Sequence, residues 1–236
     1  MCLLIAGFAF SQDEMKGTYD DLARKVEKKI RDNKKTKIDQ LKVTNDNGTI
    51  YVSGVAKMFG SKWLAEDIAG KVDNVKAVKN EIALTEGERI DDVDIQGQVI
   101  NRIRSNLTGS PFDIINVEVH SGFVRLTGNV RDQTLYDDSF QAAIWVQGVR
   151  GVENKIEHAS IAAGDERLRQ VILARIQREF PQYFNGKDPQ VLIIVQSGRV
   201  ALIGYVDSNV SVQKIGTMVR SINGVLSVNN QLQTAH

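Results

Sequence analysis

The chain contains the same glycine-framed segment three times, and this internal repeat limits its fold more than any other feature. The copies run over residues 48–54, 122–128 and 198–204, so they start 74 and 76 residues apart (122 − 48 and 198 − 122). In each copy two glycines lie six residues apart, with apolar residues two and four places after the first. This spacing predicts a tight turn that leads into a half-buried strand. We therefore expect an array of three similar units.

The sequence around each copy predicts the same order of elements. Leu22, Val26 and Ile30 are spaced by four, which predicts an amphipathic helix before the first copy. We expect this helix to begin at Thr18, because Thr18 to Asp21 match a capping box. Alternating apolar residues predict two strands joined by the glycine turn, and a second helix and a third strand follow. The expected order in every unit is α-β-β-α-β.

Residues at fixed distances after the second glycine strengthen this alignment. A valine follows 21 and 24 residues later in every copy, and an asparagine follows 26 residues later. These positions are Val75, Val149 and Val225, then Val78, Val152 and Val228, then Asn80, Asn154 and Asn230. A glycine hairpin followed at this distance by such a valine and asparagine segment resembles the BON domain. The resemblance extends from about Tyr19 to Thr234.

The resemblance implies an α+β fold in which each unit has a small mixed sheet with two helices on one face. It also implies a non-catalytic protein of the periplasm or cell envelope, similar to OsmY-like proteins. Such a protein would contact phospholipid surfaces or partner proteins in osmotic stress. The hairpin glycines are then scaffold residues, namely Gly48, Gly54, Gly122, Gly128, Gly198 and Gly204.

Three units of about 70 to 75 residues suit a chain of 236 residues. We place a leader at residues 1–14 and the repeats at residues 15–85, 86–161 and 162–236, and we expect Ala162 to Gly164 to be a linker before the first helix of repeat 3. These repeats carry 15 basic and 10 acidic, 7 and 12, and 8 and 5 charged side chains, which gives net charges of +5, −5 and +3. The net charge of the whole chain is only +1, which argues against a nucleic-acid partner.

The leader contains an apolar run from Cys2 to Phe10, which is too short to span a bilayer. It resembles the end of a secretory signal, with Ala9 and Ser11 as small residues before a cut, although a basic start is missing. The other interpretations are a short disordered tail and a start site assigned too far downstream. The signal pattern favours an exported or periplasmic protein.

Asn80, Asn154 and Asn230 have the same period-two phase as buried residues of the third strand. An unsatisfied buried amide costs about 1 to 3 kcal/mol, so we expect each side chain to be hydrogen-bonded within the fold. We assign the three asparagines a structural role.

Repeat 1 carries the features that most suggest a contact surface. Its basic run consists of Lys28, Lys29, Lys34 and Lys35. Apolar residues follow its hairpin at Met58, Phe59 and Trp63, where the other repeats have polar residues. This set predicts a contact with an anionic membrane surface or a partner. The other interpretations are a solvated helix face for the lysines and a small core for the aromatic residues.

Repeat 3 is expected to have apolar residues on the outward face of its sheet as well as on the inner one. The outward residues are Leu192, Ile194, Ala201 and Ile203. A sheet that is apolar on both faces is usually covered on both. This pattern predicts a contact with another repeat or with a second copy of the chain, and a bound lipid or small ligand is the other interpretation.

The sequence offers no catalytic or cofactor constellation. His120, His158 and His236 have no metal-ligand spacing, and the hairpin glycines are followed by a strand, whereas a phosphate loop leads into a helix. We therefore expect no enzyme activity, no cofactor and no metal. The predicted function is binding of a phospholipid surface or an envelope protein. A sensor of a small ion or ligand, built from the same repeats, is the alternative.

Overall fold

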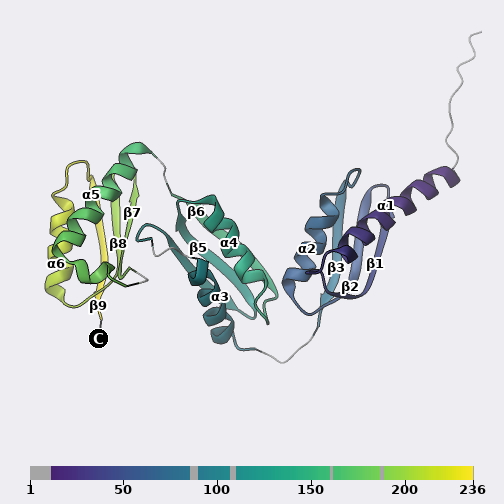
Figure 1. The fold of residues 1–236 in the computed structure, drawn as a ribbon, viewed down its shortest axis with the longest axis horizontal. Helices are drawn as coiled ribbons and strands as arrows, with labels where there is room; N and C mark the ends of the chain where they lie inside the picture. The colour runs from purple at the N-terminus through teal and green to yellow at the C-terminus, as the bar shows by residue number, and fades with distance from the viewer. Residues whose placement is uncertain (1–11, 86–89, 107–109, 160–161, 187–188, 236) are drawn as a thin grey trace, which may run out of the picture. The chain divides into compact units, whose positions relative to one another are not determined.

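In the computed structural model the chain forms three repeats of one two-layer fold (Figure 1). The structure describes residues 12–85, 90–106, 110–159, 162–186 and 189–235. Residues 1–11 of the predicted leader therefore lie outside the described residues, as does His236. The predicted α+β class and the α-β-β-α-β order are confirmed in every repeat.

The helices and strands of the three repeats correspond one to one, apart from a short extra 3₁₀ helix in repeat 3. Repeat 1 consists of α1 (Gln12–Asp32), β1 (Ile38–Asp46), β2 (Thr49–Ala56), α2 (Phe59–Gly70) and β3 (Ala77–Leu84). Repeat 2 consists of α3 (Asp92–Asn106), β4 (Ile114–His120), β5 (Phe123–Val130), α4 (Gln133–Ile144) and β6 (Gly151–His158). Repeat 3 consists of α5 (Ala163–Glu179), η1 (Pro181–Phe184), β7 (Val191–Gln196), β8 (Arg199–Val206), α6 (Asn209–Arg220) and β9 (Ser227–Thr234).

Each sheet has three strands, and the strand after the hairpin turn lies in the middle. The first two strands are antiparallel and joined by the glycine turn. The third strand is parallel to the middle strand in repeats 1 and 3, with Ile50 opposite Val78 and Val200 opposite Val228. The sheets are therefore mixed, and their first strand is always an edge strand.

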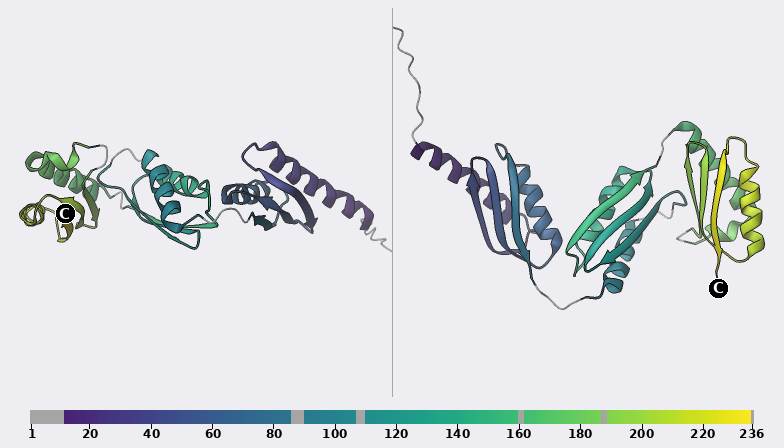
Figure 2. Two further views of the ribbon diagram at one scale, coloured as in Figure 1. Left: turned by 90° about the horizontal axis from the view of Figure 1, so that it is seen from below. Right: turned by 180° about the vertical axis from the view of Figure 1, so that it is seen from behind.

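Both helices of a repeat cover the same face of its sheet, as the second view in Figure 2 shows most clearly. In repeat 1 this layer buries Val26 and Ile30 of α1 against Ile50 and Val52 of β2. The corresponding core of repeat 3 is built around Ile172, Ile176, Ile193, Leu202 and Ile215. These residues recur at the helical and strand periods that the sequence predicts, so the core follows directly from the pattern.

Two element boundaries differ from the sequence prediction. Helix α1 begins at Gln12, so Thr18 lies inside the helix and the helix start expected there was wrong. Helix α5 begins at Ala163, within the segment expected to link repeats 2 and 3. Neither stretch contains a proline, and nothing in the backbone stops the helix from extending towards its N-terminus.

Residue contacts group the chain into two units. The first comprises Met1–Asp91 and Ile144–Gly151, and the second comprises Asp92–Ala143 and Val152–His236. The second unit thus contains most of repeat 2 together with the whole of repeat 3.

Candidate functional site

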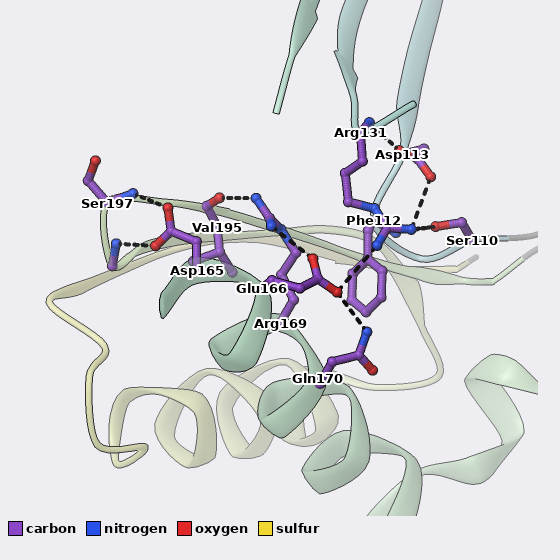
Figure 3. Close-up of polar contacts among 11 residues, drawn as sticks. Ser110, Phe112, Asp113, Arg131, Asp165, Glu166, Arg169, Gln170, Val195 and Ser197 are labelled. Atoms are coloured by element: carbon purple, nitrogen blue, oxygen red, sulfur yellow. Dashed lines mark hydrogen bonds and ion pairs between the residues drawn. The ribbon is translucent and has the colours of Figure 1, made fainter. Parts of the chain in front are cut away.

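An aspartate at the start of the first helix holds the hairpin turn in repeats 2 and 3. In repeat 3 the two carboxylate oxygens of Asp165 accept hydrogen bonds from the backbone N–H groups of Ser197 and Gly198 at 2.8 and 2.9 Å (Figure 3). Asp92 accepts the equivalent bonds from Ser121 and Gly122 at 2.7 and 2.8 Å. The sequence alone does not indicate this contact, because the turn lies about 30 residues further along the chain than Asp92.

The asparagine of the third strand makes the same two hydrogen bonds in all three repeats. Its amide nitrogen donates to a carbonyl of the second helix, at 2.8 Å from Asn80 to Lys62, 3.3 Å from Asn154 to Tyr136 and 2.9 Å from Asn230 to Val212. Its amide oxygen accepts from the backbone N–H two residues later in the same strand. The side chain therefore ties the second helix to the edge of the sheet.

All four lysines of the basic run in repeat 1 are exposed. Lys28 and Lys29 are exposed on α1, and Lys34 and Lys35 are exposed in the turn that follows it. Other basic residues of this repeat are paired, including Arg31 with Glu27 and Lys71 with Asp67. Within the described residues, none of the four lysines of the run takes part in an ion pair.

The turn that carries Lys34 and Lys35 touches the start of α2. The Ser61 hydroxyl donates a hydrogen bond to the Lys35 carbonyl at 3.1 Å. Met58 is the residue before α2 and Phe59 is its first residue, and both are partly buried, as is Trp63 one turn later. In the first unit, the Trp145 ring packs against Gly60. The structure thus brings the lysine turn and the apolar residues of the prediction to neighbouring positions.

The outward face of the repeat 3 sheet is partly exposed. Leu192, Ile194, Ala201 and Ile203 are all intermediate in exposure. Tyr205, two residues after Ile203 on the same strand, is 57% exposed and shares their phase. The predicted inter-repeat or oligomer contact of this face stays a prediction.

A shallow groove on the helical side of repeat 3 combines basic and apolar residues. It is lined by Arg175 and Arg178 of α5 together with Val171, Ile222 and the polar residues Ser221 and Asn223. Val171 is 46% exposed at its edge. The two arginines share Glu179 at 3.7 Å each, so their charges are partly neutralised.

A polar cluster in the second unit joins residues of repeats 2 and 3. The Arg131 guanidinium lies 4.6 Å from the centre of the Phe112 ring and donates to the Ser110 hydroxyl at 3.1 Å. It also lies 3.6 Å from the Asp113 carboxylate and 3.5 Å from that of Glu166 at the start of α5. Hydrogen bonds from Gln170 and Arg169, together with the charge of Arg131, lower the pKa of the Glu166 carboxyl. Figure 3 shows the Arg131 guanidinium close to the Phe112 ring, with dashed lines to Ser110, Asp113 and Glu166.

The described residues contain no group of three or more His, Cys, Asp or Glu side chains that could hold a metal ion. In the same part of the chain, no helix has the length and apolar character needed to cross a membrane.

The profile described as BON domain matches residues 18–86, 91–159 and 164–235, which are the three repeats of the structure. The chain belongs to the BON domain family. The three tandem BON copies predicted from the glycine hairpins are thereby confirmed. BON domains are in general non-enzymatic and envelope-associated, and membership supports a protein of this kind.

No curated protein matches the chain. Two solved structures of CdsD, a structural protein of the type III secretion system of Chlamydia trachomatis, are similar at 14% and 15% identity. The matches cover 92% of this chain in both cases, and 98% and 94% of the CdsD chains. Their TM-scores are 0.26 and 0.24, so this likeness carries no argument about the BON repeats.

Proposed function

We propose that this BON protein is a non-catalytic component of the periplasmic side of the cell envelope that docks on anionic phospholipid surfaces through repeat 1. The observation that carries the proposal is a set of four exposed lysines for which the described part of the chain supplies no ion-pair partner, Lys28, Lys29, Lys34 and Lys35. A role in osmotic or envelope stress, as in OsmY-like proteins, would be the setting of this contact.

The charge of the lysine run is available to a ligand because none of the four lysines forms an ion pair within the described residues. A lysine near an anionic membrane contributes about 1 kcal/mol, so four of them give a useful but reversible attraction. Met58 and Phe59 lie beside the turn that bears two of these lysines, and they could add a small apolar contact with the headgroup region.

Vesicle binding by the full chain tests the proposal. Co-sedimentation would compare vesicles containing phosphatidylglycerol with vesicles of phosphatidylcholine alone, at several salt concentrations. We expect binding only to the anionic vesicles, and we expect it to weaken as salt screens the lysines. In a variant that combines Lys28→Glu, Lys29→Glu and Phe59→Ser, affinity should fall by at least about thirtyfold.

A matched control separates this surface from net charge. Lys42 and Lys76 are also exposed lysines of repeat 1, and reversing both changes the charge of the chain by the same amount. The control variant, Lys42→Glu with Lys76→Glu, should retain most of the binding. Equal loss in both variants, or no binding to anionic vesicles at all, would contradict docking through the lysine run.

The alternative, a sensor of a small ion or ligand, is favoured by one observation, the groove that holds Arg175 and Arg178 and would suit an anion. A variant with Arg175→Glu and Arg178→Glu distinguishes the two functions. In the sensor it would lose binding of a small anion such as inorganic phosphate, whereas in the docking protein its vesicle binding would be unchanged. Vesicle binding that survives this change belongs to repeat 1, whereas binding lost here and retained in the repeat 1 variant belongs to the groove.

A further inference from the structure

We propose that repeats 2 and 3 form one cooperative two-repeat unit, in which the segment Ser110–Asp113 of repeat 2 completes the core and covers the sheet edge of repeat 3. Repeat 3 is then an incomplete domain by itself, and its interaction surface for repeat 2 is the free edge of β7. The proposal does not depend on lipid binding.

Phe112 supplies the apolar part of this interface. It precedes β4 of repeat 2, yet it belongs to the same buried cluster as Leu168, Ile172 and Ile193 of repeat 3. Only 5% of Phe112 is exposed. A buried phenyl ring stabilises whichever core surrounds it, so this residue of repeat 2 contributes directly to the stability of repeat 3.

The backbone next to Phe112 pairs with the edge strand. The Ile193 N–H of β7 donates to the Pro111 carbonyl at 2.6 Å, on the side of β7 that does not pair with β8. The Val195 carbonyl of the same edge accepts from the Arg169 guanidinium at 2.7 Å. Arg169 is only 1% exposed, so this donor is held inside repeat 3. Together the two contacts satisfy an edge that would otherwise be open to pairing with another chain.

Charged residues also connect repeat 2 with repeat 3. Arg131 stacks on Phe112 and reaches both Asp113 of its own repeat and Glu166 of α5 (Figure 3). Glu166 in turn accepts a hydrogen bond from Arg169 at 3.2 Å. Arg131 thereby connects the segment Ser110–Asp113 with helix α5, whose Arg169 binds the edge of β7.

The sequence of β7 explains why this repeat needs a cover. The strand reads Val-Leu-Ile-Ile-Val-Gln and contains no charged residue, and its pairing with β8 has no bulge. Both features leave an edge strand prone to pairing with a second chain. A fixed segment of the preceding repeat removes that hazard without an extra strand.

Hydrogen exchange of the full chain, measured by mass spectrometry on peptides from each repeat, tests the coupling. In a Phe112→Ala variant we expect the protected amides of β7 and β8 to exchange about a hundredfold faster. Amides of β2 in repeat 1 should keep their rates. The matched control is Phe123→Ala, which removes a phenyl ring from an exposed position of repeat 2 and should leave repeat 3 unchanged.

The repeat in which exchange becomes faster in Phe112→Ala decides the result. Faster exchange in repeat 3, alone or together with repeat 2, supports the two-repeat unit. Faster exchange confined to repeat 2 overturns it, because Phe112 would then stabilise only its own repeat.

If Phe112→Ala does not fold, two less disruptive variants test the same interface. Arg131→Gln and Glu166→Gln each remove one partner of the ion pair between the repeats, and the double variant completes a cycle. We expect the effects on β7 exchange to be non-additive by at least about twofold. Additive effects would show that the two residues do not interact in solution and would overturn the proposed interface.

Discussion

The edge strands of repeats 1 and 3 occupy the same place in the same fold, yet they are protected by different means. Strand β1 contains Asp39, Lys42 and Asp46, and it is interrupted between Asp39 and Lys42, where Gln40 has a positive φ. Strand β7 is uncharged and regular, and it is covered by residues of repeat 2. Charge and a bulge make a strand unsuitable for pairing, whereas a regular apolar strand must be covered.

The difference shows how tandem copies of one domain divide their tasks. A repeat that protects its own edge can keep its charged surface for other molecules, which is the role that we propose for the exposed lysines of repeat 1. A repeat that depends on its neighbour uses its surface for assembly within the chain. The shared topology therefore does not imply a shared function for the three repeats.

The largest expected effect tests the bulge itself. In the regular pairing of repeat 3, a Cβ at Gly204 would lie 1.9 Å from the Gln190 carbonyl oxygen, and the φ of Gly204 is 137°. At Gly54, opposite the interrupted part of β1, the nearest atoms are the Ile38 side chain at 2.7 Å and the Asp39 carbonyl at 2.9 Å. We expect Gly204→Ala to destabilise repeat 3 by more than about 4 kcal/mol and Gly54→Ala to cost about 2 kcal/mol.

Urea denaturation followed by hydrogen exchange in each repeat would measure both glycine variants. Equal losses of stability in Gly204→Ala and Gly54→Ala would mean that the interruption in β1 leaves no extra space for a Cβ at residue 54. The comparison between the two edges would then rest on charge alone.

A smaller effect is expected at the hairpin turns, which the two repeats also hold differently. In repeat 3 the turn is held by Asp165, which is buried and accepts two backbone N–H groups from 32 and 33 residues away. In repeat 1 the Gly48 N–H is satisfied locally, by the Asn45 side chain at 2.9 Å. In Asp165→Asn the new NH₂ group would face one of the two backbone N–H groups, and the hydrogen bond there would be lost. We therefore expect the free energy of unfolding of repeat 3 to fall by about 2 to 3 kcal/mol.

The local turn of repeat 1 provides the comparison for Asp165. Asn45→Ala should cost only about 1 kcal/mol, measured by the same denaturation. Asp94→Asn, an exposed carboxylate in the first turn of α3, controls for the loss of charge and should stay within about 0.5 kcal/mol. If Asp165→Asn were as neutral as this control, the long-range hydrogen bonds would not stabilise the turn.

Much of this architecture could be predicted from the sequence, because the hairpin glycines and the strand pattern are local signals. The repeat number, the element order and the phase of Asn80 all depend on spacing within one repeat. The role of Phe112 could not be predicted, since its partners are in the next repeat and its own neighbours, Pro111 and Asp113, indicate only a turn. The same holds for Asp165 and Arg131, whose partners are distant in sequence. The start of α1 was misjudged because a capping pattern also occurs inside helices.

The smallest expected effect concerns a position that differs in charge between repeats. Three residues after the second hairpin glycine the chain has Lys57, Arg131 and Asp207. Lys57 is exposed and Arg131 contacts repeat 3, whereas Asp207 accepts hydrogen bonds from Ser211 and Tyr183 at 2.6 Å each. These bonds, with a further one from Ser208, lower the pKa of the Asp207 carboxyl below its ordinary value of 3.8.

A lowered pKa in the folded protein means that the ionised carboxylate stabilises repeat 3 above the unfolded pKa. This contribution is lost as the pH falls below about 4 and through the folded pKa. Asp207→Asn should therefore be less stable than the natural protein at neutral pH, and the difference should shrink towards pH 2. Denaturation of repeat 3 at a series of pH values would measure this difference in stability, with Tyr183→Phe as the partner variant that removes one of the donors.

A difference that stays constant from pH 7 to pH 2 would show that the hydrogen bonds do not depend on the charge of Asp207. Lys57, Arg131 and Asp207 would then differ only in the neighbours that they contact. The lysine run of repeat 1 would be the remaining electrostatic difference between the repeats that this comparison rests on.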